Sequence, residues 1–225
     1  MKKPLLIIFI TLFIDQAVKF WIKTHMYFQE QIHVIGNWFI IHFTENNGMA
    51  FGMEFAGEYG KLFLSVFRII AVAGIGWYLV DLVQKKAHPG FITAIALIFA
   101  GALGNIIDSA FYGILFSDSG HFEVARFLPE EGGYAGFLHG RVVDMFYFPI
   151  ITGHLPTWFP FWGGEEFTFF SPVFNIADSA ITIGVFMIIL FQKKYFPKKT
   201  QPEHLPTTTS DGNTVSSDNL SSLTS

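Results

Sequence analysis

The chain has 225 residues, of which 51% are hydrophobic, 28 are phenylalanine and only 14% are charged. Its mean hydropathy is positive. Water-soluble domains of this size rarely have such a composition, so a membrane protein is predicted. The net charge of −4 gives no reason to expect nucleic acid as a partner, and the absence of cysteine excludes disulfides, thiol nucleophiles and cysteine-bound metal.

Four apolar stretches have the length needed to cross a bilayer, about 20 residues each. They lie at about 4–21, 62–83, 91–116 and 173–191. The first stretch has no small-x-small cleavage site and carries Asp15 and Lys19 within its apolar body, so it is predicted to be a retained helix rather than a cleaved signal peptide.

The lysines predict how the chain is oriented in the membrane. They cluster before the first stretch, between the second and third, and after the fourth, as Lys2, Lys3, Lys85, Lys86, Lys193, Lys194, Lys198 and Lys199. Such clusters belong on the cytoplasmic side. We therefore expect an all-α polytopic membrane protein over residues 1–199, with four transmembrane helices and both termini cytoplasmic. The Ser- and Thr-rich residues 200–225 are expected to be a disordered cytoplasmic tail.

The two remaining connections, about 22–61 and 117–172, are expected to face outward. Alternating apolar residues in the first predict a small β-hairpin or curved sheet that lies on the membrane, with a turn signal at 46–48. A loop as long as the second is usually functional or partly structured. Its aromatic residues favour anchoring at the lipid headgroups over direct substrate contact; they are Trp158, Phe159, Phe161 and Trp162.

An Asn and an Asp three residues apart occur twice, in NIIDSA at 105–110 and NIADSA at 175–180. The third and fourth helices run in opposite directions, so both pairs are expected at the outer end of the bundle. Residues i and i+3 share a helix face, so each Asn is predicted to hydrogen-bond near its own Asp. Asp144, in the apolar run HGRVVDMFYF of the long loop, would bring a third carboxylate to the same place.

Two carboxylates that lie close together in a medium of low dielectric constant share a proton. Such a pair provides a base to activate water and an acid to protonate a peptide group. Spacing does not identify the pair among the three aspartates. For Asp108, a purely structural hydrogen-bonding role and a functional role are equally favoured. For Asp144 and Asp178 a functional role is favoured, because acids are costly inside membranes.

The other polar groups of the apolar stretches favour structural roles. Asp15 and Lys19 are spaced i, i+4 and are predicted to form a structural ion network, with Arg68 as another possible partner of Asp15. Four histidines of the outer loops lack metal-binding spacing, namely His42, His121, His139 and His154. The sequence contains no GxSxG motif, so a serine mechanism lacks support.

Five sequence blocks stand out along the chain, namely IDQAVK at 14–19, ENNGMAFG at 45–52, GALGNIID at 101–108, GRVVDMF at 140–146 and FNIADSAITIG at 174–184. Together they resemble the lipoprotein signal peptidase (signal peptidase II) family. The resemblance covers about residues 10–192, and its specificity comes from five blocks in the family's order.

The resemblance implies a catalytic dyad of Asp144 and Asp178. Asn105, Asp108 and Asn175 would support and orient the dyad, and Asn46 would bind the substrate backbone. The implied substrate is a prolipoprotein whose signal peptide is cut before a diacylglyceryl-modified cysteine, without metal or cofactor. We expect a monomer in contact with membrane lipid in the bacterial cytoplasmic (inner) membrane, with its active site near the periplasmic face.

The chain departs from the family pattern at several positions. Ser109 stands where an Arg usually follows the GNxxD aspartate, and Arg141 is a candidate to replace that cation. Met145 replaces a usual Phe, and 114–139 and 149–171 are longer than the typical connections. These differences concern substrate contacts and loop geometry rather than the chemistry.

Two other functional classes compete with a peptidase. A proton- or ion-coupled transporter also uses intramembrane carboxylates, but the inner halves of the third and fourth helices offer no polar relay. A catalytically silent scaffold or binding protein would tolerate Asn in place of the aspartates. A presenilin-like protease would require a GxGD motif, which the sequence lacks.

Overall fold

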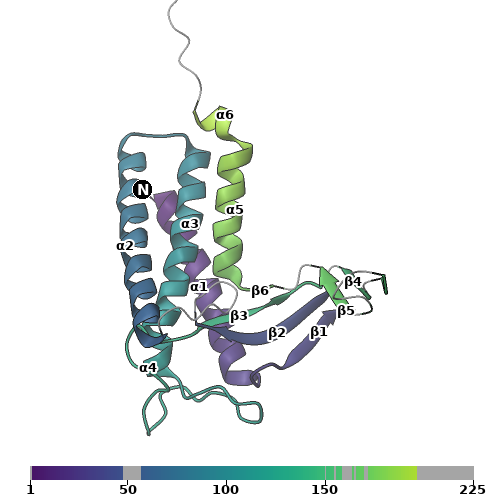
Figure 1. Cartoon of the computed structure of the whole chain (residues 1–225). Helices are drawn as coiled ribbons and strands as arrows, with labels where there is room; N and C mark the ends of the chain where they lie inside the picture. Colours follow the sequence, from purple (N-terminus) through teal and green to yellow (C-terminus); the bar gives the residue numbers. More distant parts are fainter. Residues whose placement is uncertain are drawn as a thin grey trace, which may run out of the picture. The chain divides into compact units, whose positions relative to one another are not determined.

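Four long helices and a small antiparallel sheet make up the described part of the chain (Figure 1). The structure is a computed structural model that describes residues 2–47, 57–149, 151–154, 156–158, 164, 166–169 and 172–196. Residues 1–195 form one unit and 196–225 a second. All described helices and strands belong to the first unit. The predicted tail at 200–225 lies outside the described residues.

Three helices are long and apolar enough to cross a membrane, over Lys2–His25, Phe63–Gln84 and Pro89–Leu115. The first is α1 (Lys2–His25) and the second belongs to α2 (Gly57–Gln84). The third combines α3 (Pro89–Ile107), a π-helical turn η2 (Asp108–Tyr112) and the short α4 (Gly113–Leu115). The bounds of all three differ by only a few residues from those predicted.

The fourth apolar helix is shorter than the predicted stretch at 173–191. It is α5 (Ile176–Leu190), whose 15 residues rise about 22 Å, and it is followed by α6 (Gln192–Tyr195). The prediction was wrong at its start because Val173 and Phe174 form strand β6 and Asn175 caps the helix. The residues before α5 therefore belong to the sheet.

Apolar side chains cover the outside of the helices, whereas small residues fill the contacts between them. Phe63 and Leu190 are 73% and 72% exposed, whereas Ala96 and Ala177 are fully buried. Helices surrounded by lipid associate through such close backbone packing. A Cβ atom on Gly101 of α3 would lie 2.2 Å from the carbonyl oxygen of Ala177 in α5. The backbones of α3 and α5 therefore approach each other closely at this point.

The sheet is larger than the predicted hairpin. Its antiparallel order is β1 (Gln31–Ile35), β2 (Phe39–Asn46), β3 (Val142–Tyr147) and β6 (Val173–Phe174). The hairpin between β1 and β2 turns at Gly36, whose φ is +52°, and β2 continues to Asn46. The predicted turn signal at 46–48 begins at the end of β2 and does not form this hairpin, and its Gly48 lies outside the described residues.

The long outer connection supplies ordered strands to this part of the fold. It contributes β3 to the main sheet and a separate two-stranded sheet of β4 (Ile151–His154) and β5 (Glu166–Phe169). The predicted "all-α" class therefore needs correction to a mostly helical protein with a small antiparallel sheet. Three of the four aromatic residues predicted to anchor this loop lie outside the described residues, namely Phe159, Phe161 and Trp162.

A hydrophobic core joins the sheet to the helices. Its buried members come from α1, β2, β3 and the end of the third apolar helix, and include Ile22, Phe43, Phe116, Val143 and Met145. This core holds β3 against the helix ends and thereby places Asp144, which lies between Val143 and Met145, among the helices.

Gly101 provides a test of the close contact between α3 and α5. Gly101→Ala should destabilise the fold by about 1–3 kcal/mol, because the new methyl group collides with backbone that has little freedom to move. Gly74→Ala in α2 is the matched control. A Cβ atom at that position would have no atom within 4 Å, so this change should be neutral or stabilise by about 0.5–1 kcal/mol. Unfolding in mixed micelles measures both; equal effects would contradict the predicted contact.

Candidate active site

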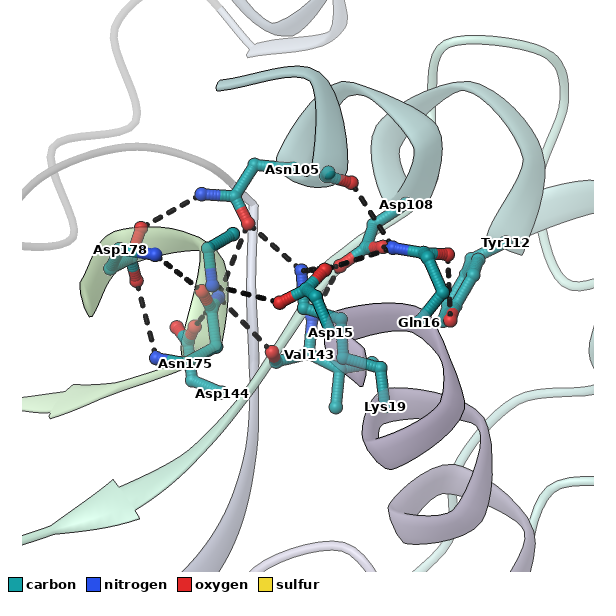
Figure 2. A network of polar contacts seen from close by, with 12 residues as sticks. Asp15, Gln16, Lys19, Asn105, Asp108, Tyr112, Val143, Asp144, Asn175 and Asp178 are labelled. Atoms are coloured by element: carbon teal, nitrogen blue, oxygen red, sulfur yellow. Dashed lines mark hydrogen bonds and ion pairs between the residues drawn. The ribbon is translucent and has the colours of Figure 1, made fainter. Parts of the chain in front are cut away.

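Charged and amide side chains gather where α1, α3, α5 and β3 meet (Figure 2). The side chains of Lys19, Asp108 and Asn175 are fully buried, and Asp15 and Asp144 are only 1% and 4% exposed. Buried polar groups are stable only when they are paired and hydrogen-bonded. The cluster meets this condition through one lysine and two asparagines.

Lys19 is the cation of the cluster. Its Nζ lies 2.7 Å from Oδ2 of Asp108 and 3.0 Å from Oδ2 of Asp15, and it donates a hydrogen bond of 2.9 Å to Oδ1 of Asn105. An ammonium group has three protons, and three acceptors take them. The predicted pair of Asp15 and Lys19 is therefore present, and it extends to α3.

Asp15 also holds the start of α5. Its Oδ1 accepts a hydrogen bond of 2.8 Å from the backbone N–H of Ala177, one of the N–H groups in the first helical turn that have no partner within the helix. A carboxylate at this end also interacts favourably with the helix dipole. Asp15 thus links the first and last of the long helices.

Asp108 is bound by this ion network. Besides Lys19, it accepts hydrogen bonds from Nε2 of Gln16 at 2.9 Å and from the backbone N–H of Val143 at 3.3 Å. Lys19 and Gln16 hold its carboxylate on the side of α1, within the same cluster of acids as Asp144 and Asp178. The π-helical turn η2 begins at Asp108, and such turns are frequent at functional sites.

The second Asn–Asp pair forms the N-terminal cap of α5. Asn175 accepts a hydrogen bond of 2.9 Å from the backbone N–H of Asp178, and Asp178 Oδ2 accepts one of 3.4 Å from the backbone N–H of Asn175. This reciprocal arrangement is a capping box. The predicted contact of an Asn with its own Asp is thus present in this pair.

The two asparagine amides connect the remaining aspartates. Nδ2 of Asn105 donates to Oδ1 of Asp178 at 2.8 Å, and Nδ2 of Asn175 donates to Oδ1 of Asp144 at 2.7 Å. Nδ2 of Asn175 also lies 3.2 Å from Oδ1 of Asn105. Asn105 therefore binds the Asp of the other helix, against the prediction, because Asp108 turns toward Lys19. Figure 2 shows Asp144 and Asp178 close to Asn175.

The environment of Asp144 favours its protonated form. Burial raises the pKa of this carboxyl group to about 7, and the negative charge of Asp178 acts in the same direction. The positive charge of Lys19 and the hydrogen bond from Asn175 oppose the rise only in part. At neutral pH this group therefore exchanges a proton readily.

A cavity of about 380 Å³ opens beside Asp178. Its lining is otherwise apolar or hydroxyl-bearing and consists of Pro172, Phe174, Asp178, Ser179, Thr182 and Ile183. Ligand sites are commonly apolar cavities of this size with few polar groups. Asp178 is thus accessible to a ligand. Arg68 of α2 lies close enough for the charge of Asp178 to act on its guanidinium group.

A second ion network lies beside the first and contains Arg141. Its Nη1 pairs with Glu45 at 3.0 Å and with Asp118 at 2.7 Å, and Glu45 also pairs with the buried Lys23. That Arg141 replaces the missing cation therefore stays a prediction, and Lys19 is the cation that binds Asp108. Ser109 donates its hydroxyl to the Asn105 carbonyl oxygen at 3.1 Å.

Sequence reasoning missed at least four residues that the structure places in these networks, Gln16, Lys23, Glu45 and Asp118. Lys23 follows Asp15 and Lys19 at the same spacing of four along α1, so a polar stripe on one helix face was a usable signal. Asn46, the expected substrate-binding residue, ends β2 opposite Val142 and is exposed. The described residues contain no group of three metal ligands, and independence from metal stays a prediction.

Comparisons with known proteins show the family of this chain. A family model described as signal peptidase (SPase) II matches residues 7–193. The chain belongs to the signal peptidase II family. A lipoprotein signal peptidase from Porphyromonas gingivalis is 50% identical over 203 residues, which are 88% of each chain. One from Amoebophilus asiaticus is 36% identical over 191 residues, covering 84% of this chain and 76% of the relative.

Solved structures support the same family fold. Two structures, each of a bacterial membrane enzyme, have TM-scores of 0.57 at 27% and 29% identity, covering 90% and 89% of this chain and 96% of theirs. As a member of the signal peptidase II family, the chain is an aspartic-type peptidase of bacterial membranes that cleaves signal peptides from prolipoproteins. The cluster of acids described above is the candidate for its active site.

Two lysine–aspartate pairs of the same spacing test the role of the ion network. Lys19→Met should destabilise the fold by about 3–5 kcal/mol, because it leaves two buried aspartates without their cation. Lys85→Met is the control. Lys85 directly follows the end of α2 and pairs at the protein surface with Asp81 of that helix, at 2.8 Å. Its loss should change stability by about 0.5 kcal/mol or less. Equal losses in chemical unfolding would contradict the prediction.

Proposed function

We propose that Asp144 and Asp178 form the catalytic dyad of this signal peptidase. The observation that carries the proposal is the asparagine bridge, in which Asn175 binds the Asp144 carboxyl group with its side chain and Asp178 with its backbone N–H. Asn105 fixes the other oxygen of Asp178. Both acids are thereby held in defined orientations, and Asp178 lines a cavity.

The geometry suits water-mediated hydrolysis of a peptide bond. Asp178, at the cavity, acts as the base that takes a proton from water while the water oxygen attacks the scissile carbonyl carbon. Asp144 supplies a proton to the carbonyl oxygen, in keeping with its raised pKa. When the tetrahedral intermediate collapses, the carbon–nitrogen bond breaks, the leaving amine takes a proton from Asp178, and Asp144 regains its own.

The substrate and its placement are part of this proposal. The prolipoprotein carries a diacylglyceryl-modified cysteine after the scissile bond, and Asn46 binds the substrate backbone near the end of β2. The apolar lining of the cavity beside Asp178 favours a lipid-bearing substrate that approaches from the membrane. Cleavage of a lipidated precursor but not of its unlipidated counterpart would support this part.

The membrane topology belongs to the same proposal. α5 completes a bundle of four spans although its helix is short, because its exposed side chains are apolar, as in Ile183, Phe186 and Leu190. Both termini then lie in the cytoplasm and the dyad lies near the periplasmic face of the inner membrane. The enzyme acts as a monomer. Family membership does not favour the transporter alternative.

Replacement of either acid tests the dyad. Asp144→Asn and Asp178→Asn should each lower the rate of cleavage of a lipidated precursor by at least about a hundredfold, because general acid–base catalysis is lost. Asp81→Asn is the control, since Asp81 pairs with Lys85 far along α2, and it should leave the rate near that of the wild type. The rate is measured with purified protein in micelles, and thermal unfolding verifies the fold. Full activity in either dyad variant would remove the assignment.

The raised pKa of Asp144 predicts how stability depends on pH. In the folded protein this carboxyl group keeps its proton up to about pH 7, whereas in the unfolded chain it loses it near the ordinary value of 3.8. The folded state therefore binds more protons at Asp144 between these values, so the contribution of this group to stability is greatest below about pH 4. It falls by up to about 1.4 kcal/mol per pH unit as the pH rises to about 7.

This pH dependence is measured by unfolding the wild type and Asp144→Asn across the same range. The variant has no proton to lose at this position, so its stability should fall less steeply between pH 4 and 7. Cleavage by the wild type should decline above about pH 7, where Asp144 loses the proton that it supplies. Identical slopes for the two proteins would show that Asp144 is ionised in the fold.

A further inference from the structure

A cavity of about 390 Å³ lies at the opposite end of the helices from the acids. It is lined by the start of α1, the end of α2 and the start of α3, through Lys2, Lys3, Pro4, Val83, Pro89, Ile92 and Thr93. From Lys2 to Asp15, α1 rises about 20 Å, and from Pro89 to Asn105, α3 rises about 24 Å. The cavity is therefore separated from the candidate active site by most of the thickness of a membrane.

The lining of this cavity combines positive charge with apolar walls. Lys2 and Lys3 are exposed, and within the described part of the chain neither forms an ion pair with a carboxylate. Lys85, at the same end of α2, is instead paired with Asp81. Pro4, Val83 and Ile92 provide the apolar surface. The site thus offers two unneutralised cations at the mouth of an apolar space between helices.

These properties match an anionic phospholipid. A phosphate group would be attracted by the ammonium groups, and an acyl chain would fill the apolar space that remains between the helices. Basic pockets between transmembrane helices bind lipid headgroups in this way. A free phosphate ion would use the lysines but would gain nothing from the walls.

We propose that the cavity is a binding site for an anionic phospholipid, with the phosphate at Lys2 and Lys3 and an acyl chain along Val83 and Ile92. The site is independent of the peptidase chemistry, because it shares no residue with the acid cluster. It also differs from a diffuse attraction of surface lysines to the membrane. A specific site depends on these two lysines and on the cavity, whereas a diffuse attraction depends on the number of charges at this end.

Lysines of α6 provide a matched control for this distinction. Tyr195 of α6 lies against Phe91, with ring centroids 5.8 Å apart, so Lys193 and Lys194 are at the same end of the protein. They do not line the cavity. Replacing either pair by glutamine removes the same charge from this end.

The experiment measures lipid binding to the purified full chain in detergent by native mass spectrometry. The probes are palmitoyl-oleoyl phosphatidylglycerol, the corresponding phosphatidylcholine, and inorganic phosphate as a competitor. Phosphatidylglycerol should bind more tightly than phosphatidylcholine. The double change Lys2→Gln and Lys3→Gln should weaken its binding by about fivefold per lysine. The change of Lys193 and Lys194 to Gln should weaken it by much less.

A second variant tests the cavity itself and leaves both lysines in place. Ile92→Trp fills the apolar space and should displace the lipid, while thermal unfolding without lipid shows that the protein is folded. Equal weakening by the two lysine pairs would overturn the proposal in favour of diffuse attraction. Equal binding of the two lipids would overturn it, as would unchanged binding to Ile92→Trp. Displacement of the lipid by millimolar inorganic phosphate would assign the site to free phosphate instead.

Discussion

The ammonium group of Lys19 is the interaction on which the interior of this protein depends. It lies among Asp15, Asp108 and Asn105, which come from two helices, and Asp15 extends the connection to the first turn of a third. A charge without a partner in this place would be strongly destabilising, whereas the complete network satisfies every proton of the lysine. The helices around the acids are thus aligned by ionic contacts as well as by packing.

This network separates structural acids from reactive ones. Asp15 and Asp108 are each paired with a cation in direct contact, and both also accept hydrogen bonds. Asp144 has only an amide donor in direct contact and the charge of Asp178 nearby. The four carboxyl groups of the cluster therefore have different environments, and burial together with the charge of Asp178 raises the pKa of Asp144 to about 7.

Much of this arrangement could be predicted from the sequence. The apolar stretches, the buried pair of Asp15 and Lys19, and the approach of Asp144 to the helix ends followed from composition and from spacing along helices. The start of the fourth helix did not, because an Asn followed by an Asp three residues later reads equally as a helix face or as a cap. Only pairing of Phe174 with Phe146 shows that the strand continues to that point.

The partners of individual side chains were harder to predict, for a physical reason. Asn105 and Asn175 occur in nearly the same hexapeptide, yet the first lies inside a helix and the second precedes one. Their hydrogen bonds depend on which groups the tertiary fold brings close, and these come from residues far away in the sequence. The partners of Arg141 were equally hard to predict, since Glu45 and Asp118 reach it from separate segments.

The pairing of β3 with β6 has a consequence for variation among related enzymes. Phe146 pairs with Phe174, so the strand with Asp144 is joined directly to the residue that precedes the cap of α5. β4 and β5, which lie between these two strands in the sequence, form a separate sheet and take no part in that junction. Insertions or deletions there can reshape the outer surface of the enzyme while the distance between the two acids stays the same.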